Sequence, residues 1–210
     1  MTIKLYHHPF SRASGTVWVL EELGQPYELE FMDLMKGEHK QPDFKTKNPM
    51  GKLPTIVDGD TVVTEAAAIA LYLADRYSYG TLAPKFDDPR RGPYLRWSFY
   101  APSVIEPGCA AHSSKWEFRP SAVGWGTWDE MVATIDQAVA EGYVAGKGFT
   151  MADVIFGGTL RFMTMFKMLD VSPAIAGYLE RINARPALKR ADEVNTRVMK
   201  ERGLKLPGQG

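Results

Sequence analysis

The chain has 210 residues, of which 45% are hydrophobic, and its 25 basic and 25 acidic residues give a formal net charge of zero. This balance argues against a broad electrostatic attraction to nucleic acid or membranes. No apolar run is long enough to span a bilayer, the first residues lead directly into a strand pattern, and the single cysteine, Cys109, cannot form an internal disulfide. We therefore expect a globular cytoplasmic protein of one large or two small domains.

The first third of the chain predicts a small sheet with helices packed on it. Residues 3–6 and 27–32 have strand patterns, and a helix between them is expected to end at Gly24, with Ser11 or Ser14 as its N-cap. Residues 55–57 and 61–63 predict a hairpin around an Asp-Gly-Asp turn, and residues 65–77 predict a helix. The order β-α-β followed by β-β-α is typical of a thioredoxin-like fold.

The loop after the first strand carries hydroxyls where redox proteins of that fold carry C-x-x-C. Residues 11–14 are SRAS, and a serine hydroxyl cannot form a mixed disulfide, so thiol–disulfide exchange through this loop is excluded. Such a hydroxyl can instead hydrogen-bond an anion at a helix N-terminus. Taken alone, Ser11 is better explained as a helix cap or turn residue.

The rest of the chain predicts helices alone. Residues 79–88 are rich in turn residues and form a linker, so we expect domains at 1–78 and 89–210. Asp88-Pro89 predicts the next helix start, and several prolines up to residue 114 predict one broken helix or two. Residues 149–154, FTMADV, predict a capping box between Thr150 and Asp153 at the start of a buried helix.

Several of these motifs resemble the glutathione S-transferase family, of the bacterial cytosolic type with a serine in the first loop. The family pattern N-P-x-x-x-[VL]-P is present as residues 48–54, NPMGKLP, and its E-S pair is present as Glu65-Ala66. A-I-x-x-Y-L follows at residues 68–73, and residues 149–153 and 184–191 resemble parts of the family's C-terminal domain. The resemblance implies a thioredoxin-like α/β domain followed by an all-α domain, and a cis Leu53-Pro54 bond, although cis bonds are otherwise uncommon.

The resemblance also implies roles for individual residues. Ser11 matches the catalytic serine that stabilises the glutathione thiolate, with Ser14 as the rival position. The residues expected to bind glutathione are His39, Lys52, Leu53, Pro54, Glu65 and Ala66. His39 and Lys52 are candidates for the glycine carboxylate, Leu53 for the cysteinyl backbone, and Glu65 for the γ-glutamyl amino group. Because Ala66 lacks the family's serine hydroxyl, it leaves only a backbone N–H there, which implies weaker binding.

The implied function is a glutathione transferase that attacks a small hydrophobic electrophile. Phe10, Trp97 and Tyr100 are candidates for the hydrophobic substrate site, although core packing is the better explanation for most aromatic residues of the helical region. Glutathione is the co-substrate, no metal site is expected from the histidine spacing, and a homodimer is implied. Two alternatives stay open: a glutathione-dependent isomerase, dehalogenase, etherase or peroxidase, and a non-catalytic binding or regulatory protein of the same fold.

Overall fold

The computed structural model describes residues 2–205, and its packing divides them into two compact units. The first unit runs to Leu73 and takes up the chain again at Arg185, and the second is Ala74–Ala184. The predicted domain limits at residues 78 and 89 stay a prediction. The packing differs from them chiefly at the C-terminus, where the last helix belongs with the first unit.

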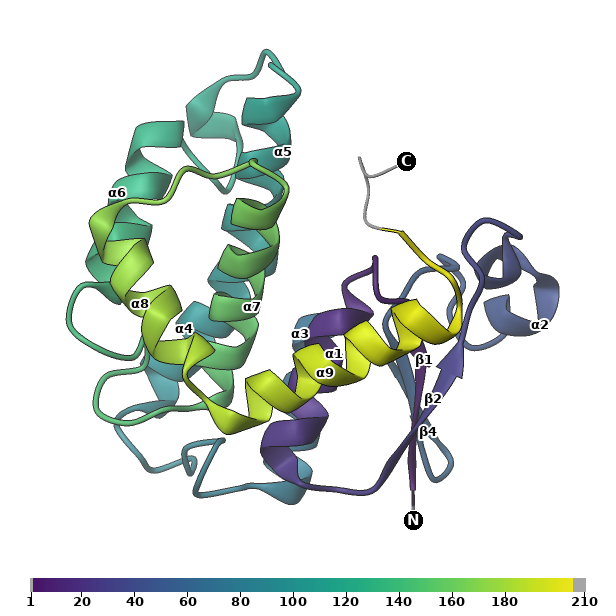
Figure 1. Ribbon diagram of the computed structural model, residues 1–210. Helices are drawn as coiled ribbons and strands as arrows, with labels where there is room; N and C mark the ends of the chain where they lie inside the picture. The colour runs from purple at the N-terminus through teal and green to yellow at the C-terminus, as the bar shows by residue number, and fades with distance from the viewer. Residues whose placement is uncertain (1, 206–210) are drawn as a thin grey trace. The chain divides into compact units, whose positions relative to one another are not determined.

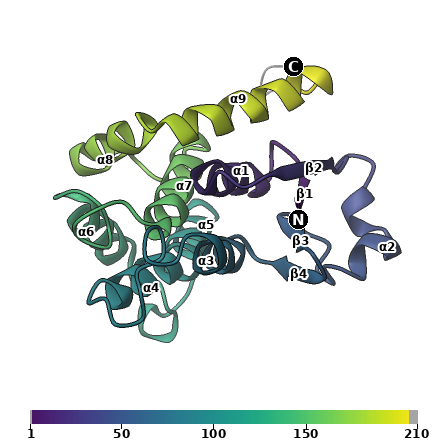
Figure 2. The same ribbon diagram turned by 90° about the horizontal axis from the view of Figure 1, so that it is seen from below.

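The first unit is built on a four-stranded mixed sheet. Its strands are β1 (Ile3–His7), β2 (Tyr27–Phe31), β3 (Thr55–Asp58) and β4 (Thr61–Thr64). They lie in the order β2-β1-β3-β4, with β2 parallel to β1 and the other pairs antiparallel (Figure 2). The predicted strands and hairpin are confirmed, and the sheet with its helices confirms the thioredoxin-like α/β fold.

Successive residues of β1 point to opposite faces of the sheet and alternate between buried and half-buried, so one face is covered more closely than the other. Ile3 and Leu5 are fully buried on one face, and Tyr6 on the other packs edge-on against Phe44. The helical segments of the unit are α1 (Ala13–Leu23), η1 (Glu38–Lys40), α2 (Pro42–Lys45), α3 (Ala66–Tyr77, which continues into the second unit) and α9 (Pro186–Glu201). Helix α9 packs along α1, as the yellow and purple helices of Figure 1 show.

The ends of α1 confirm one prediction and correct another. Gly24 is the C-cap in the left-handed conformation, with φ of 63°, as predicted. The N-cap is Arg12, whose side chain makes no capping bond, so the prediction of Ser11 or Ser14 at that position is wrong. Ser11 precedes the cap because the chain makes one more turn after His8, whose carbonyl accepts the Ser11 N–H at 3.0 Å. Ser14 lies in the first helical turn.

The second unit contains helices and no strand within the part of the chain that the structure describes. Its segments are α4 (Arg91–Tyr100), the π-helical η2 (Ala101–Ile105), α5 (Glu106–Ser113), η3 (Pro120–Ala122), α6 (Trp128–Val139), α7 (Met151–Met165) and α8 (Pro173–Asn183). The broken helix predicted between residues 89 and 114 is confirmed. Its predicted start at Asp88-Pro89 is wrong: Asp88 accepts the Arg90 N–H at 2.8 Å in a turn, and the helix begins at Arg91.

The capping box predicted at the start of α7 is confirmed. The Asp153 carboxylate accepts the backbone N–H of Thr150 at 2.9 Å and its hydroxyl at 3.2 Å. Asp153 also accepts the Val144 N–H at 2.9 Å and the Tyr178 hydroxyl at 3.1 Å. Asp153 therefore joins α7 to the preceding loop and to α8 in the core of this unit.

Candidate functional site

Three segments of the first unit meet at one end of the sheet. Tyr6 pairs with Thr55 across β1 and β3, and Thr55 pairs with Thr64 across β3 and β4. The loop after β1, the residues before β3 and the residues after β4 therefore share that end. This register brings together the segments that carry Ser11, Leu53-Pro54 and Glu65, which are separated by up to 54 positions in the sequence.

The Ser11 hydroxyl is half-exposed and held in place by the backbone around it. Its oxygen accepts the Ala13 N–H at 3.1 Å and lies 2.8 Å from the His8 carbonyl, to which it donates. A bound anion can take the hydroxyl hydrogen in place of the His8 carbonyl, while the Ala13 N–H stays on the oxygen. Ser14 donates its hydroxyl to the Ser11 carbonyl at 2.9 Å, so this hydroxyl is already bonded to the loop before the helix.

The Leu53-Pro54 bond is cis, as the resemblance implies. Pro54 is buried, Leu53 is half-buried and Lys52 is exposed. The turn before them is held by Asn48, a buried residue whose amide donates to the Lys52 carbonyl at 2.9 Å and to the Thr55 hydroxyl at 3.1 Å. In the sequence Asn48 stands out only as part of the family pattern, and the Asn-Pro pair is the local signal for this supporting role.

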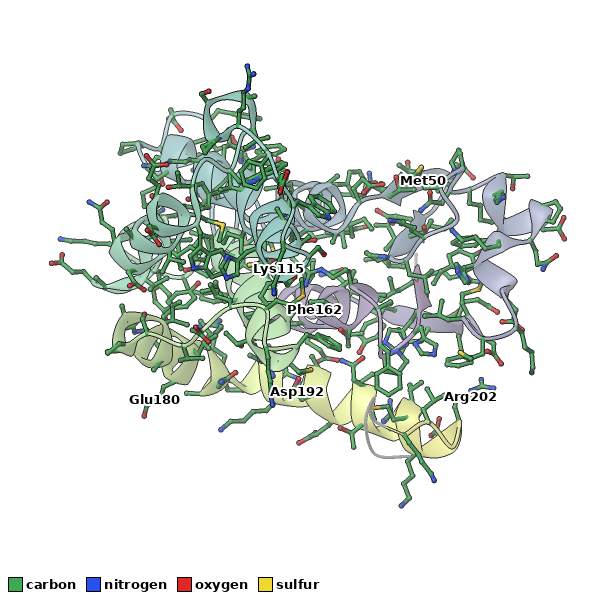
Figure 3. The ribbon with its side chains drawn as sticks, turned by 90° about the horizontal axis from the view of Figure 1, so that it is seen from above. Met50, Lys115, Phe162, Glu180, Asp192 and Arg202 are labelled. Atoms are coloured by element: carbon green, nitrogen blue, oxygen red, sulfur yellow. The ribbon has the colours of Figure 1, made fainter. Side chains whose placement is uncertain are left out.

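His39 is attached to the same turn through its neighbour Lys40. The Lys40 ammonium donates to the carbonyls of Met50 at 2.9 Å and Gly51 at 2.6 Å, and Figure 3 labels Met50. Gly51 has φ of 56°, and a Cβ there would meet the His39 carbonyl at 2.5 Å, so only glycine fits this approach. Sequence analysis did not identify Lys40, because nothing local distinguishes its ammonium from that of a solvated lysine.

The His39 imidazole has an unused hydrogen-bonding atom. Its Nδ1 is buried and has no partner within residues 2–205. Burial, with a smaller contribution from the positive charge of Lys40, lowers the pKa of His39 below its ordinary value. His39 is therefore neutral near pH 7 and can offer a ligand a neutral hydrogen bond but no charge.

Glu65 stands between β4 and α3 in a conformation that favours glycine. Its φ is 67°, and its side chain is exposed. A non-glycine residue in this region costs about 1–3 kcal/mol, and such residues cluster at binding sites. Ala66 follows as the first residue of α3, so its N–H belongs to the helix N-terminus, where anions are favoured.

His7, the last residue of β1, and His8, which follows it, are buried and neutral. Burial lowers the pKa of His7 to about 4, although a 2.8 Å hydrogen bond between its Nε2 and Asn195 opposes the shift. Burial also lowers the pKa of His8, against the nearby charge of Asp33. His8 Nδ1 accepts the Phe10 N–H at 3.1 Å and thereby shapes the turn that presents Ser11.

The candidate residues of the hydrophobic substrate site belong to different units. Phe10 is half-buried in the first unit, where its ring lies 5.6 Å from that of His8. In the second unit Trp97 is buried and packs edge-on against Tyr100 and Phe156. Trp97 is therefore part of the core of the second unit. A substrate site shared by Phe10, Trp97 and Tyr100 stays a prediction.

Other reactive groups offer no competing chemistry among residues 2–205. Cys109 is fully buried, and burial raises the pKa of its thiol to about 11, which leaves it protonated near neutrality. The described residues contain no group of three or more His, Cys, Asp or Glu side chains that could hold a metal ion. No helix in that range is long and apolar enough to cross a bilayer.

Known proteins resemble the chain both in sequence and in structure. Residues 1–75 match the family model "Glutathione S-transferase, N-terminal domain". Glutathione S-transferase Z2 of Arabidopsis thaliana is 29% identical over 206 residues, covering 90% of each chain, and glutathione S-transferase 3 of Zea mays is 44% identical over 77 residues, covering 36% of this chain and 35% of its own. Glutathione transferase URE2P6 from Phanerochaete chrysosporium, in complex with oxidized glutathione, has a TM-score of 0.78 and 27% identity, with 94% of this chain and 97% of that chain covered.

The mixed sheet, the cis proline before β3 and the helical second unit define a thioredoxin-like domain joined to an all-α part. Residues 1–75 match the N-terminal domain of the glutathione S-transferase family, and the chain as a whole is similar to glutathione S-transferases in sequence and in structure.

Proposed function

We propose that the protein is a glutathione transferase in which the Ser11 hydroxyl stabilises the thiolate of bound glutathione. The observation that carries this proposal is the position of Ser11: the residue is half-exposed, and its hydroxyl lies beside the N-terminus of α1 and is oriented by the Ala13 N–H. The hydroxyl donates to sulfur, and the helix dipole favours the same negative charge.

The magnitudes are sufficient for this role. A free thiol has a pKa of about 8.5, and lowering it by ~2 units requires ~2.7 kcal/mol. One hydrogen bond to a charged group contributes ~1.5–3 kcal/mol, and a helix N-terminus contributes ~0.3–1 kcal/mol. The two together supply the shift, so glutathione would be mostly thiolate near neutral pH.

The other residues at this end of the sheet would hold the rest of the tripeptide. The Leu53 backbone would pair with the cysteinyl residue as an added strand, next to the cis Pro54. Glu65 would accept the γ-glutamyl amino group, and the Ala66 N–H would bind the adjacent carboxylate. For the glycine carboxylate, Lys52 supplies the positive charge, and neutral His39, with its unpartnered buried nitrogen, supplies a hydrogen bond.

The reaction would be attack by the thiolate on an electrophilic atom of a small hydrophobic substrate, forming a bond to sulfur. Phe10, Trp97 and Tyr100 are the proposed contacts for that substrate. The mechanism assigns no step to a metal. We also propose that the enzyme is a cytoplasmic homodimer, as the family resemblance implies.

Kinetics of the serine variants test this function. Ser11→Ala should lower kcat/KM for conjugation about 100-fold, the factor that corresponds to a loss of ~2.7 kcal/mol. Ser14→Ala is the matched control and should change kcat/KM by less than about twofold, because its hydroxyl donates to the backbone carbonyl of Ser11 and is not free to reach a ligand. Equal kcat/KM for Ser11→Ala and the unmodified protein would contradict the proposed role of Ser11.

A substrate panel separates this function from its alternatives. Retention on immobilised glutathione without turnover of any electrophile would indicate a binding protein. Turnover of halides, peroxides or aryl ethers in preference to conjugation substrates would indicate one of the other glutathione-dependent reactions. Glu65 in its left-handed conformation supports a binding site at this position in each of these cases, because strained residues of this kind cluster at binding sites.

A further inference from the structure

The side chain of Asn195, on α9, contacts both ends of the loop that carries Ser11. Its carboxamide oxygen lies 2.8 Å from Nε2 of His7, the last residue of β1, and its nitrogen donates to the Ser14 carbonyl in the first turn of α1 at 3.2 Å. Asn195 is 188 and 181 positions away from these residues in the chain. One side chain of the last helix therefore joins the strand before the loop to the helix after it.

The hydrogen bonds of this amide fix its orientation. The nitrogen also donates to the carbonyl of Ala191, one turn earlier in α9, at 2.9 Å. A rotated amide would point its oxygen at two carbonyl oxygens, which cannot donate, so the nitrogen must face Ser14 and Ala191. The oxygen then accepts from His7, which requires the ring proton to be on Nε2.

The His7 ring depends on Asn195 for its position. The side chain is fully buried, and its Nδ1 has no partner within residues 2–205, so the bond to Asn195 is what satisfies the ring N–H. His8 is the next residue, and its carbonyl accepts both the N–H and the hydroxyl of Ser11. A movement of His7 would therefore move the group to which Ser11 is bonded.

Ion pairs hold α9 at the opposite end of α1. Arg185 bonds to the Glu22 carboxylate at 2.6 and 2.8 Å, and Arg190 bonds to the Glu21 carboxylate at 2.7 Å. From there α9 runs along α1 and reaches its first turn with Asn195 (Figure 1). The contacts at the two ends can be altered separately, so an effect on the loop can be distinguished from an effect of helix packing.

We propose that Asn195 is a positioning residue, which sets the spacing between the end of β1 and the start of α1 and so holds the Ser11 hydroxyl where a thiolate can accept its hydrogen. Asn195 acts through His7 and the Ser14 backbone and touches neither glutathione nor the electrophile. The inference rests on the proposed function, because the spacing matters to the reaction only if Ser11 stabilises the thiolate. Ser14→Ala keeps the carbonyl and therefore keeps this bond.

The pKa of the glutathione thiol on the protein tests this role. Asn195→Ala should raise that pKa by about one unit, because the hydroxyl loses its fixed position while the helix N-terminus remains. The loss in kcat/KM should then be about eightfold near pH 6 and less than about twofold near pH 9, where both thiols are ionised. A smaller folded fraction would instead lower the rate equally at both pH values. Arg190→Ala, which breaks a contact at the far end of α1, is the matched control and should leave the thiol pKa unchanged.

The tautomer of His7 tests the network in the unmodified protein, so the result does not depend on the folding of Asn195→Ala. Two-bond proton–nitrogen correlations of a ¹⁵N-labelled sample identify the protonated nitrogen of each histidine ring, and His7→Gln assigns the His7 signals. The proton should be on Nε2. A proton on Nδ1 would overturn the proposal, since the amide could not then bond to both His7 and Ser14.

Comparison with Ser11→Ala separates this inference from the proposed function. If Ser11→Ala raises the thiol pKa and Asn195→Ala does not, Asn195 has no positioning role and this inference alone is wrong. An equal rise in Arg190→Ala would also overturn it, because the effect would then belong to helix packing in general. If neither Ser11→Ala nor Asn195→Ala raises the thiol pKa, the proposed function is wrong as well.

Discussion

Two long helices of this protein, α1 and α7, begin beside a hydroxyl side chain, and the two hydroxyls have different surroundings. Ser11 is half-exposed, its oxygen bonds only to backbone groups, and α1 has no acidic residue in its first turn. Thr150 is fully buried, and its hydroxyl donates to the carboxylate of Asp153, three residues further on.

This difference indicates what each helix N-terminus does. The positive end of α7 is already neutralised by its own carboxylate, which also accepts bonds from Val144 and Tyr178. The positive end of α1 has no such internal anion, so an external one can occupy it. Similar local sequences therefore serve folding in the second unit and, by our proposal, thiolate binding in the first.

The largest expected effect is the loss of the internal anion at α7. Asp153→Ala should lower the free energy of unfolding by about 4 kcal/mol, because it leaves several buried donors without an acceptor. Denaturant titration measures this change. The turnover of each folded Asp153→Ala molecule should equal that of the unmodified protein. If this variant lost activity without losing stability, Asp153 would serve catalysis and not folding, and the contrast between α1 and α7 would be wrong.

The second effect is the loss of folding stability at low pH that comes from His7. It is measured on the fold and is independent of the ionisation of bound glutathione. The pKa of His7 is about 4 in the folded protein, against an ordinary value of 6.5 for a solvated histidine, so the unfolded chain binds a proton first as pH falls. Stability from this group is complete above about pH 6.5 and is lost towards pH 4; between about pH 7.5 and 5 the loss is about 2 kcal/mol. Denaturant titrations at the two pH values measure it.

His7→Gln removes this titrating group and should reduce the pH dependence by about 2 kcal/mol, leaving the part that comes from His8 and His39. His112→Gln, which replaces an exposed histidine, is the control and should retain the full slope. An unchanged slope in His7→Gln would show that another group is responsible.

A smaller effect is expected from the hydroxyl at α7. Thr150→Ala removes the hydroxyl but keeps the backbone N–H on Asp153, so it should cost about 1 kcal/mol of stability. The same denaturant titration measures the change. A cost as large as that of Asp153→Ala would mean that the hydroxyl, and not the carboxylate, holds this helix start.

The smallest effect is expected within α1 itself. Ser14, in the first turn, donates its hydroxyl to the carbonyl of Ser11 just before the helix, which is a local bond without a buried partner. Ser14→Ala should therefore change stability by less than about 0.5 kcal/mol by denaturant titration. A change well above that value would assign Ser14 a part in holding the Ser11 loop.

Local patterns predicted much of the fold. Gly24 ends α1, the Asp-Gly-Asp turn closes the hairpin, and Thr150 with Asp153 starts α7, because each signal acts within a few residues. Predictions that depended on choosing between neighbouring caps were wrong at Ser11 and at Asp88. At both places the chain makes an additional turn before the helix begins. The capping preferences of single residues do not predict such a turn.

Long-range contacts account for what sequence analysis missed at the candidate site. The strand register places Leu53-Pro54 and Glu65 at the end of the sheet where the Ser11 loop emerges, and only the resemblance indicated this grouping. The supporting bonds from Lys40 to the turn at residues 50–51 join segments that carry no local signal. The packing of α9 on α1 could not be predicted either, because an amphipathic pattern shows that a helix has an apolar face but not which helix that face contacts.

The most direct test of the proposed thiolate site is the ionisation of the glutathione thiol on the protein. A pH titration of thiolate absorbance should give a pKa of about 6.5 for glutathione bound to the unmodified protein, from ~8.5 for the free thiol less ~2 units. The same titration with Ser11→Ala should return a pKa near ~8.5 while glutathione remains bound. An identical pKa for the two proteins would contradict the central role given to the Ser11 hydroxyl.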